Sequence, residues 1–219
     1  MTPRRANTPT LTREQIVSAA IAVVDRDGLE ALSMRKLAAE LGVGTMTLYH
    51  HVPDKSALYD LILDDVLSAV DLSDDDPSQP VEERMRRVAY ALRRALLAHP
   101  GAAIIAASRS MRTPAQLRPV EAMLQVLAEA GVPEVDAMQA VNAIGQYAVG
   151  VTTMYANHLG DVEYHDDTRE SDFGGITPEE FPNIALALSH PDHFGSWDSD
   201  FEAGLSALIK GLVTEHVAR

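Results

Sequence analysis

The residues best suited to contact another molecule lie between Ser33 and Lys55, in the run SMRKLAAELGVGTMTLYHHVPDK. The spacing predicts two short helices joined by a glycine turn at Gly42, with Val43 and Leu48 filling the gap between them. This packing leaves five side chains of the second helix outside the core: Thr45, Met46, Thr47, Tyr49 and His50. Hydroxyl and imidazole groups reach base edges or phosphates, and an aromatic ring packs on a thymine methyl or a sugar. The pattern favours DNA binding, and the alternative is an ordinary helical hairpin with polar residues on its solvent face.

Histidines near carboxylates form a second group of candidate ligands, in residues 190–193 (HPDH) and 158–167 (HLGDVEYHDD). Both segments have donors that suit a metal ion. Both also read as acidic loops, in which solvated side chains are the commoner outcome, so we expect no metal and no cofactor. The alternative is an all-α metal-dependent hydrolase. No HExxH helix and no nucleophile elbow supports it, so we expect no enzyme activity.

The charge is unevenly distributed along the chain of 219 residues, whose formal net charge is −14. Residues 1–60 hold seven basic and seven acidic residues, whereas residues 61–219 hold eleven basic and twenty-five acidic ones. Only the N-terminal quarter can therefore approach a phosphate backbone without strong repulsion. The imbalance indicates two units with different partners.

Helical periodicity recurs along the chain and strand alternation does not, so we expect an all-α fold. Capping-box spacing marks four helix starts, at Thr12, Thr113, Thr177 and Ser199. The acidic segment Asp71–Pro80, with its two prolines, reads as a linker. The expected helices span about 12–27, 33–41, 45–50, 54–66, 82–98, 101–110, 114–130, 134–158, 178–189 and 198–217.

The sequence also bears on location. Cysteine is absent, which excludes disulfides and thiolate metal sites, and the first ten residues lack the apolar stretch of a secretory signal. Residues 137–160 carry no charge, yet their amides, hydroxyls and histidine favour a helix buried among other helices over a membrane span. We expect a cytoplasmic protein that does not enter a membrane.

Residues Leu11–Val70 resemble the DNA-binding domain of the tetracycline-repressor (TetR) family of regulators. The matching run is LTREQIVSAAIAVVDRDGLEALSMRKLAAELGVGTMTLYHHVPDKSALYDLIL. The resemblance extends into the second unit, where His99-Pro100-Gly101, Leu124–Gly131, Asn142–Gly150 and Phe201–Leu212 are similar to the tetracycline repressor's own subfamily. It implies a flexible arm (1–10), an N-terminal three-helix helix-turn-helix domain (11–70) and a C-terminal helical ligand-binding and dimerisation domain (71–219).

The resemblance also implies roles in binding palindromic double-stranded operator DNA. The expected base readers are Arg35, Thr45 and Met46, and the expected positioning contacts are Thr47, Tyr49, His50, His51 and Lys55. Read without the resemblance, Tyr49 could instead fill the core and Arg35 could be a solvated helix charge.

Family members dimerise through two C-terminal helices, which here correspond to about 134–158 and 198–217. Two recognition helices must sit about 34–36 Å apart to read successive major grooves. A ligand that changes this separation would couple two sites through one global state. The resemblance therefore implies a homodimeric repressor that a small molecule releases from its operator. The alternative is a constitutive DNA-binding dimer without an effector.

The tetracycline repressor holds a magnesium-bound drug, but two of the corresponding positions have changed chemistry here. Ile105 stands at the metal-binding histidine and Met154 at the metal-linked glutamate, which removes ligands that magnesium needs. We therefore expect a largely apolar effector other than tetracycline. The predicted lining is apolar at Leu92, Ile105, Met123, Tyr147, Val151 and Met154 and polar at Ser108, Asn142 and Gln146; the alternative is that these residues only fill the core.

Overall fold

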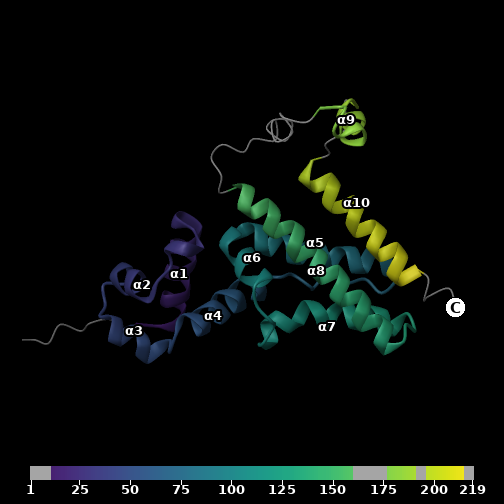
Figure 1. Cartoon of the computed structure of the whole chain (residues 1–219). Helices are drawn as coiled ribbons and strands as arrows, with labels where there is room; N and C mark the ends of the chain where they lie inside the picture. The colour runs from purple at the N-terminus through teal and green to yellow at the C-terminus, as the bar shows by residue number, and fades with distance from the viewer. Residues whose placement is uncertain (1–10, 160–176, 191–195, 215–219) are drawn as a thin grey trace, which may run out of the picture.

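The computed structural model describes residues 11–159, 177–190 and 196–214, and within these ranges it contains helices and turns but no strand (Figure 1). The all-α prediction is confirmed. The helices are α1 (Arg13–Asp27), a short 3-10 helix (Leu29–Ala31), α2 (Met34–Glu40), α3 (Thr45–His51), α4 (Lys55–Ser68), α5 (Val81–Ala98), α6 (Pro100–Ala107), α7 (Pro114–Glu129), α8 (Glu134–Leu159), α9 (Pro182–Leu188) and α10 (Trp197–Ile209), which continues into a π-helix (Lys210–Thr214).

Helices α1, α2 and α3 form the predicted helix-turn-helix unit. The capping box at its start is present, since the backbone N–H of Gln15 donates to Thr12 Oγ1 at 3.3 Å and the backbone N–H of Thr12 donates to Gln15 Oε1 at 3.0 Å. Gly42 turns the chain from α2 to α3 at a φ of +64°, which residues with a Cβ rarely adopt. Leu37 and Leu48 are fully buried on either side of this turn. The turn and the packing together determine which face of α3 points outward.

An ion-pair network also joins α1 to α2. Arg26 Nη2 lies 2.8 Å from Asp27 Oδ2 and 2.5 Å from Glu40 Oε1. Lys36 Nζ lies 2.8 Å from the same Asp27 oxygen. Hydrogen bonds from Arg26, then from Lys36, lower the pKa of Asp27 to about 2. Within the helix-turn-helix unit, Lys36 is therefore already paired with Asp27.

Helix α4 belongs to both halves of the molecule (Figure 1). It starts at Asp54, whose Oδ1 accepts the backbone N–H of Ala57 at 2.7 Å. It packs against α1 on one side and against α5, α6 and α7 on the other. Its buried side chains are Leu58, Ile62, Leu63, Val66 and Leu67. The helix-turn-helix unit is therefore joined to the rest of the chain through a continuous apolar core.

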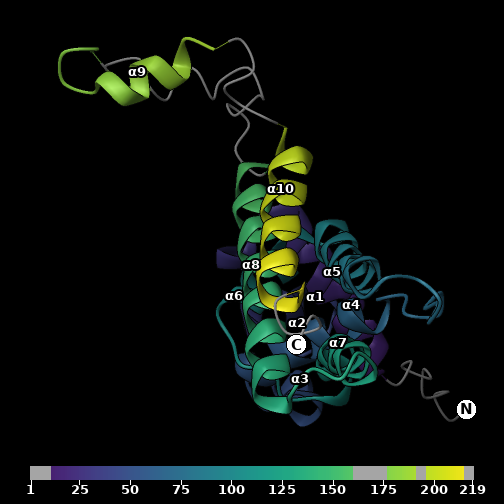
Figure 2. The same ribbon diagram turned by 90° about the vertical axis from the view of Figure 1, so that its right-hand side faces the viewer.

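Helix α8 lies at the centre of the C-terminal half, where it packs against α5, α6, α7 and α10. Figure 2 shows α8 and α10 side by side, and both views show α9 apart from the other helices. The predicted helix start at Thr177 is wrong, since α9 begins at Pro182. Glu202 of α10 accepts hydrogen bonds from Tyr90 Oη at 2.8 Å and from Arg86 Nε at 3.0 Å. Burial and then the Glu202 hydrogen bond raise the pKa of Tyr90 to about 12. In the described part of the chain, no helix is both long enough and apolar enough to cross a bilayer.

Two further predicted helix starts are wrong in detail. Thr113 makes no capping hydrogen bond, because its hydroxyl donates to Asp64 of α4. The cap of α10 is Ser196 and not Ser199, since Ser196 Oγ accepts the backbone N–H of Ser199 at 3.1 Å. Tertiary contacts and a competing local hydroxyl, which spacing does not reveal, account for both errors.

A close approach between α1 and α6 yields a first prediction. A Cβ added to Gly101 of α6 would lie 1.8 Å from Val24 Cγ1 of α1. We expect Gly101→Ala to lower the free energy of unfolding by about 1–3 kcal/mol, because the buried β-branched Val24 has little freedom to move. Chemical denaturation measures this loss.

Gly145→Ala is the matched control, because a Cβ at Gly145 meets no atom within 4 Å. There we expect a gain of up to about 1 kcal/mol from helix propensity. Equal effects of the two alanines would contradict the proposed close contact between α1 and α6.

Candidate nucleic-acid interface and ligand pocket

The outer face of α3 carries side chains that the core does not use. Met46 is 70% exposed and Tyr49 is 41% exposed, whereas Leu48 between them is fully buried. Tyr49 is therefore not a core residue, which removes the alternative interpretation of it. The other predicted contacts on α3 are likewise accessible: Thr47, His50 and His51 are exposed and Thr45 is half-buried.

The charges around α3 suit a polyanion. Arg35 is exposed on α2, and the described residues offer it no hydrogen-bond or ion-pair partner. Lys55 follows at the start of α4, where its Nζ lies 5.4 Å from the centroid of the Tyr59 ring. No acidic residue occurs between Glu40 and Asp54, although the chain as a whole has a net charge of −14. This surface can approach phosphates without a repelling carboxylate on α3 itself.

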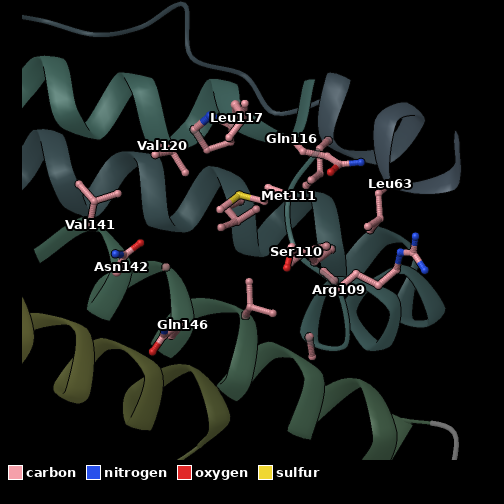
Figure 3. Close-up of a pocket in the computed structure, with 18 of the residues that line it drawn as sticks. Leu63, Arg109, Ser110, Met111, Gln116, Leu117, Val120, Val141, Asn142 and Gln146 are labelled. Atoms are coloured by element: carbon pink, nitrogen blue, oxygen red, sulfur yellow. The ribbon is translucent and has the colours of Figure 1, made fainter. Parts of the chain in front are cut away.

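A cavity of about 700 Å³ lies in the C-terminal half (Figure 3). This volume is within the range of pockets that hold drug-sized molecules. Helices α4, α5, α7 and α8 and the residues around the end of α6 supply its walls. The lining residues are Leu63, Leu67, Leu92, Leu96, Ala106, Ala107, Arg109, Ser110, Met111, Gln116, Leu117, Pro119, Val120, Met123, Val141, Asn142, Gly145, Gln146, Val149 and Gly150.

The lining is apolar apart from a few hydrogen-bonding groups. Its polar side chains are Arg109, Ser110, Gln116, Asn142 and Gln146. Arg109 is the one charged residue among them, and the lining includes neither a carboxylate nor an imidazole. Figure 3 places the Arg109 guanidinium at the same end of the cavity as Leu63 of α4. The pocket is therefore mostly apolar, with one cationic side chain at one end.

The structure brings together four of the nine predicted pocket residues: Leu92, Met123, Asn142 and Gln146. Ile105 is fully buried in the core, and Ser108 Oγ donates to the Ile105 carbonyl at 2.9 Å outside the lining. Tyr147 Oη donates to the Asp200 carbonyl at 3.0 Å, which directs it to α10. Val151 is half-buried outside the lining, and Met154 is 56% exposed.

Helical periodicity explains this division along α8. The cavity takes residues 141–142, 145–146 and 149–150, which share one face of the helix. Tyr147, Val151 and Met154 follow one another at spacings of four and three residues on a different face. From residue 137 onward α8 has no charged residue, so the sequence gives no signal for which face meets a cavity. Arg109 and Ser110 went unpredicted because the sequence places them at the end of an expected helix (101–110), whereas α6 ends at Ala107 and both lie with Met111 in a connecting segment.

The histidine segments lie largely outside the described residues. These include 160–167 and 191–193, and the side chain of His158 is not described either. Within the described part of the chain, no group of three or more His, Asp or Glu side chains is placed to hold a metal ion.

Two family models match the chain. Residues 16–62 match "Bacterial regulatory proteins, tetR family", and residues 75–216 match "Tetracyclin repressor-like, C-terminal domain". The chain belongs to the TetR family. This TetR-family protein is accordingly a helix-turn-helix transcriptional regulator, and the match to residues 16–62 covers the helix-turn-helix unit of α1–α3.

Similar proteins cover nearly the whole of this TetR-family chain. An HTH-type transcriptional regulator of Saccharopolyspora erythraea is 35% identical over 93% of this chain and 85% of its own length. The HTH-type transcriptional repressor DrrR1 of Streptomyces coeruleorubidus is 30% identical over 96% and 80%. The Streptomyces coelicolor TetR family protein ActR in complex with actinorhodin superimposes with a TM-score of 0.80, at 29% identity over 94% of this chain and 98% of ActR.

The cavity itself can be tested with a side chain that fills it. Gly145 lines the cavity, and a Cβ there meets no atom within 4 Å. We expect Gly145→Phe to fold with an unfolding free energy at least equal to that of the original protein, because the ring occupies empty space and glycine is a poor helix former. Thermal and chemical denaturation measure this. A loss of 2 kcal/mol or more, roughly the cost of overpacking a filled core, would show that the space is not there.

Proposed function

We propose that this TetR-family regulator is a dimeric repressor that binds palindromic operator DNA through α3. A small, largely apolar molecule other than tetracycline would occupy the cavity and release the protein from DNA. In this proposal residues 11–70 act as the DNA-binding unit and residues from 71 onward as the ligand-binding and dimerising unit. The proposal keeps Arg35, Thr45 and Met46 as base readers and the neighbouring polar residues as positioning contacts.

The observation that carries the proposal is that one helix touches both sites. Only Val52, Pro53 and Asp54 separate α3 from α4. Leu63 and Leu67 of α4 line the cavity. A molecule that enters the cavity therefore contacts α4, the helix that follows α3 after these three residues. A shift of α4 would change the separation of the two recognition helices in a dimer, which must match successive major grooves.

The lining supports an effector other than a magnesium-bound drug. Magnesium prefers carboxylate, phosphate and water oxygens in octahedral geometry. The cavity offers only one hydroxyl and three amide side chains, apart from the Arg109 guanidinium. ActR, which has a similar fold, is known in complex with actinorhodin and with (S)-DNPA. By analogy we assign the cavity of this chain to an organic molecule bound mainly through apolar contacts.

The exposed surface of α8 and α10 suits a second copy of the chain. Residues 137–159 of α8 include no charged residue, although acidic residues exceed basic ones by fourteen overall. On α10, Ala203 and Ala207 are exposed four residues apart and so share one face, and Gly211 in the π-helix that follows is exposed as well. Two such helices from each copy can approach closely in a four-helix bundle.

The DNA-binding proposal predicts the effect of removing two positioning contacts. We expect Tyr49→Ala combined with Lys55→Ala to weaken binding to a duplex from the protein's own promoter region by about tenfold or more. The loss of one cationic phosphate contact should also reduce the slope of log affinity against log salt by about one. Fluorescence anisotropy at several salt concentrations measures both quantities.

Arg118→Ala is the matched control, because Arg118 is an exposed cation on α7, away from α3. It should leave affinity and slope unchanged. If the double variant bound as tightly as the original protein with the same salt slope, α3 would not be the DNA-binding helix.

The dimer proposal predicts the effect of a charge on the α10 face. Ala207→Glu should convert the dimer to a monomer, because burying an unpaired carboxylate between two apolar faces is costly. Sedimentation velocity measures the change. Ala128→Glu, at an exposed alanine of α7, is the control and should remain dimeric. A dimeric Ala207→Glu variant would place the interface elsewhere.

A further inference from the structure

A short segment between α6 and α7 holds one face of α4 through hydrogen bonds. Arg109 Nη2 lies 2.9 Å from Asp60 Oδ1 and donates to Ser56 Oγ at 2.8 Å. Thr113 Oγ1 donates to Asp64. Ser56, Asp60 and Asp64 are four residues apart and therefore lie on one face of α4. We call this face, with these three residues, the polar face of α4.

Gln116, at the start of α7, adds to the same attachment. Its Nε2 donates to the Asp60 carbonyl and to Asp64 Oδ1, each at 3.4 Å. Its Oε1 accepts the backbone N–H of Arg112 at 2.8 Å, which holds the segment in place. Residues 109–116 and α4 are thus joined by several polar contacts besides the apolar core.

The same segment forms one wall of the cavity. Arg109, Ser110, Met111 and Gln116 all line it, next to Leu63 and Leu67 of α4. Two of the side chains that hold the polar face of α4, Arg109 and Gln116, are therefore within reach of a bound molecule. The side chains of Arg109 and Asp60 are 16% and 22% exposed, so their ion pair is partly shielded from water. Arg109 also lines the cavity, so a bound molecule can reach the pair.

The charge of the lining limits what can use this contact. Arg109 is the one cation of the lining, and the lining has no carboxylate to attract a cationic ligand. Its guanidinium can hold a planar anion through two hydrogen bonds. It is now held by the Asp60 carboxylate, which a ligand anion would have to replace. Such an exchange keeps the half-buried Arg109 paired and leaves the Asp60 carboxylate, which is 22% exposed, without its cation.

We propose that the effector is a largely apolar molecule with one anionic group, which takes Arg109 from Asp60 and so loosens the polar face of α4. The inference rests on the proposed function, because it assumes that the cavity is the effector site. To the proposed function it adds two statements: that the effector carries an anionic group, and that its binding breaks the contact between Arg109 and Asp60. The proposal takes the Arg109–Asp60 contact to hold α4 in the position that binds DNA. Because the anion and Asp60 compete for one guanidinium, ligand binding and DNA binding then oppose each other.

Two fluorescent probes test this inference. 8-Anilinonaphthalene-1-sulfonate has an apolar body and one anionic group, and N-phenyl-1-naphthylamine has the same rings without the sulfonate. We expect Arg109→Gln to weaken binding of the sulfonate probe by about tenfold or more and to leave binding of the neutral probe unchanged. Arg112→Gln, at an exposed arginine outside the lining, is the control and should bind both probes normally.

Asp60→Asn distinguishes competition from a purely structural ion pair. It removes the carboxylate that competes for Arg109, so we expect the sulfonate probe to bind more tightly than to the original protein. If the ion pair only stabilised the fold, Asp60→Asn and Arg109→Gln would change probe binding in the same direction. Arg109→Lys keeps the cation but loses the paired hydrogen bonds, so it should bind the sulfonate probe less tightly than the original protein and more tightly than Arg109→Gln. It replaces Arg109→Gln as the test if that variant folds poorly.

Gly145→Phe separates failure of this inference from failure of the proposed function. If it abolishes binding of both probes while Arg109→Gln affects neither, the cavity binds small molecules but Arg109 does not select an anion, and the inference is overturned. If Gly145→Phe leaves binding of both probes unchanged, they do not occupy the cavity, and the effector site itself must be placed elsewhere. In the original protein we expect the sulfonate probe to release operator DNA and the neutral probe not to release it.

Discussion

The structure depends on how α4 is held. One side of this helix buries five aliphatic side chains, from Leu58 to Leu67, against α1 and the helices of the C-terminal half. An adjoining face carries Ser56, Asp60 and Asp64, which contact the segment between α6 and α7. These two attachments differ in strength. A buried leucine or isoleucine stabilises the fold by about 1.5–3 kcal/mol, whereas a typical hydrogen bond has a net contribution of about 0.5–1.5 kcal/mol.

That difference has a consequence for regulation. A ligand cannot displace the apolar face of α4 without losing more free energy than a few contacts return. It can exchange polar partners at small net cost, because each hydrogen bond lost to α4 is replaced by one to the ligand. In the proposed mechanism the apolar contacts of α4 therefore stay in place, and the contacts of its polar face are the ones that change.

The sequence predicted best what is determined locally. The capping box at Thr12, the glycine turn at Gly42 and the buried Leu48 all depend on residues within one or two helical turns, and all are present. The exposed face of α3 follows from them, because whatever the turn and the core leave over must point outward. Thr113 shows the limit, since its spacing fits a helix cap but its hydroxyl contacts Asp64, which is 49 residues away in the chain.

The pocket depends on contacts between residues that are far apart in the chain. Its lining comes from four helices and a connecting segment, and the part of α8 that it uses is one face of a stretch without charged residues. Leu92, Met123, Asn142 and Gln146 were predicted, whereas Arg109 was expected at the end of a helix (101–110) and instead lies in the connecting segment after α6. Residues of a connecting segment are positioned by what they touch, so only the arrangement of the helices reveals them.

The distribution of charge links the two sites. In a chain of net charge −14, residues 41–53 and the cavity lining both lack a carboxylate. Acidic groups elsewhere repel anions at long range, and this repulsion falls off beyond about 8–10 Å at physiological salt. A polyanion or an anionic ligand is therefore favoured where a cation is near and few carboxylates are. Arg35 and Lys55 supply the cations around α3. In the cavity the one cation is Arg109, whose Asp60 partner is outside the lining, so an anion there must compete with that single carboxylate.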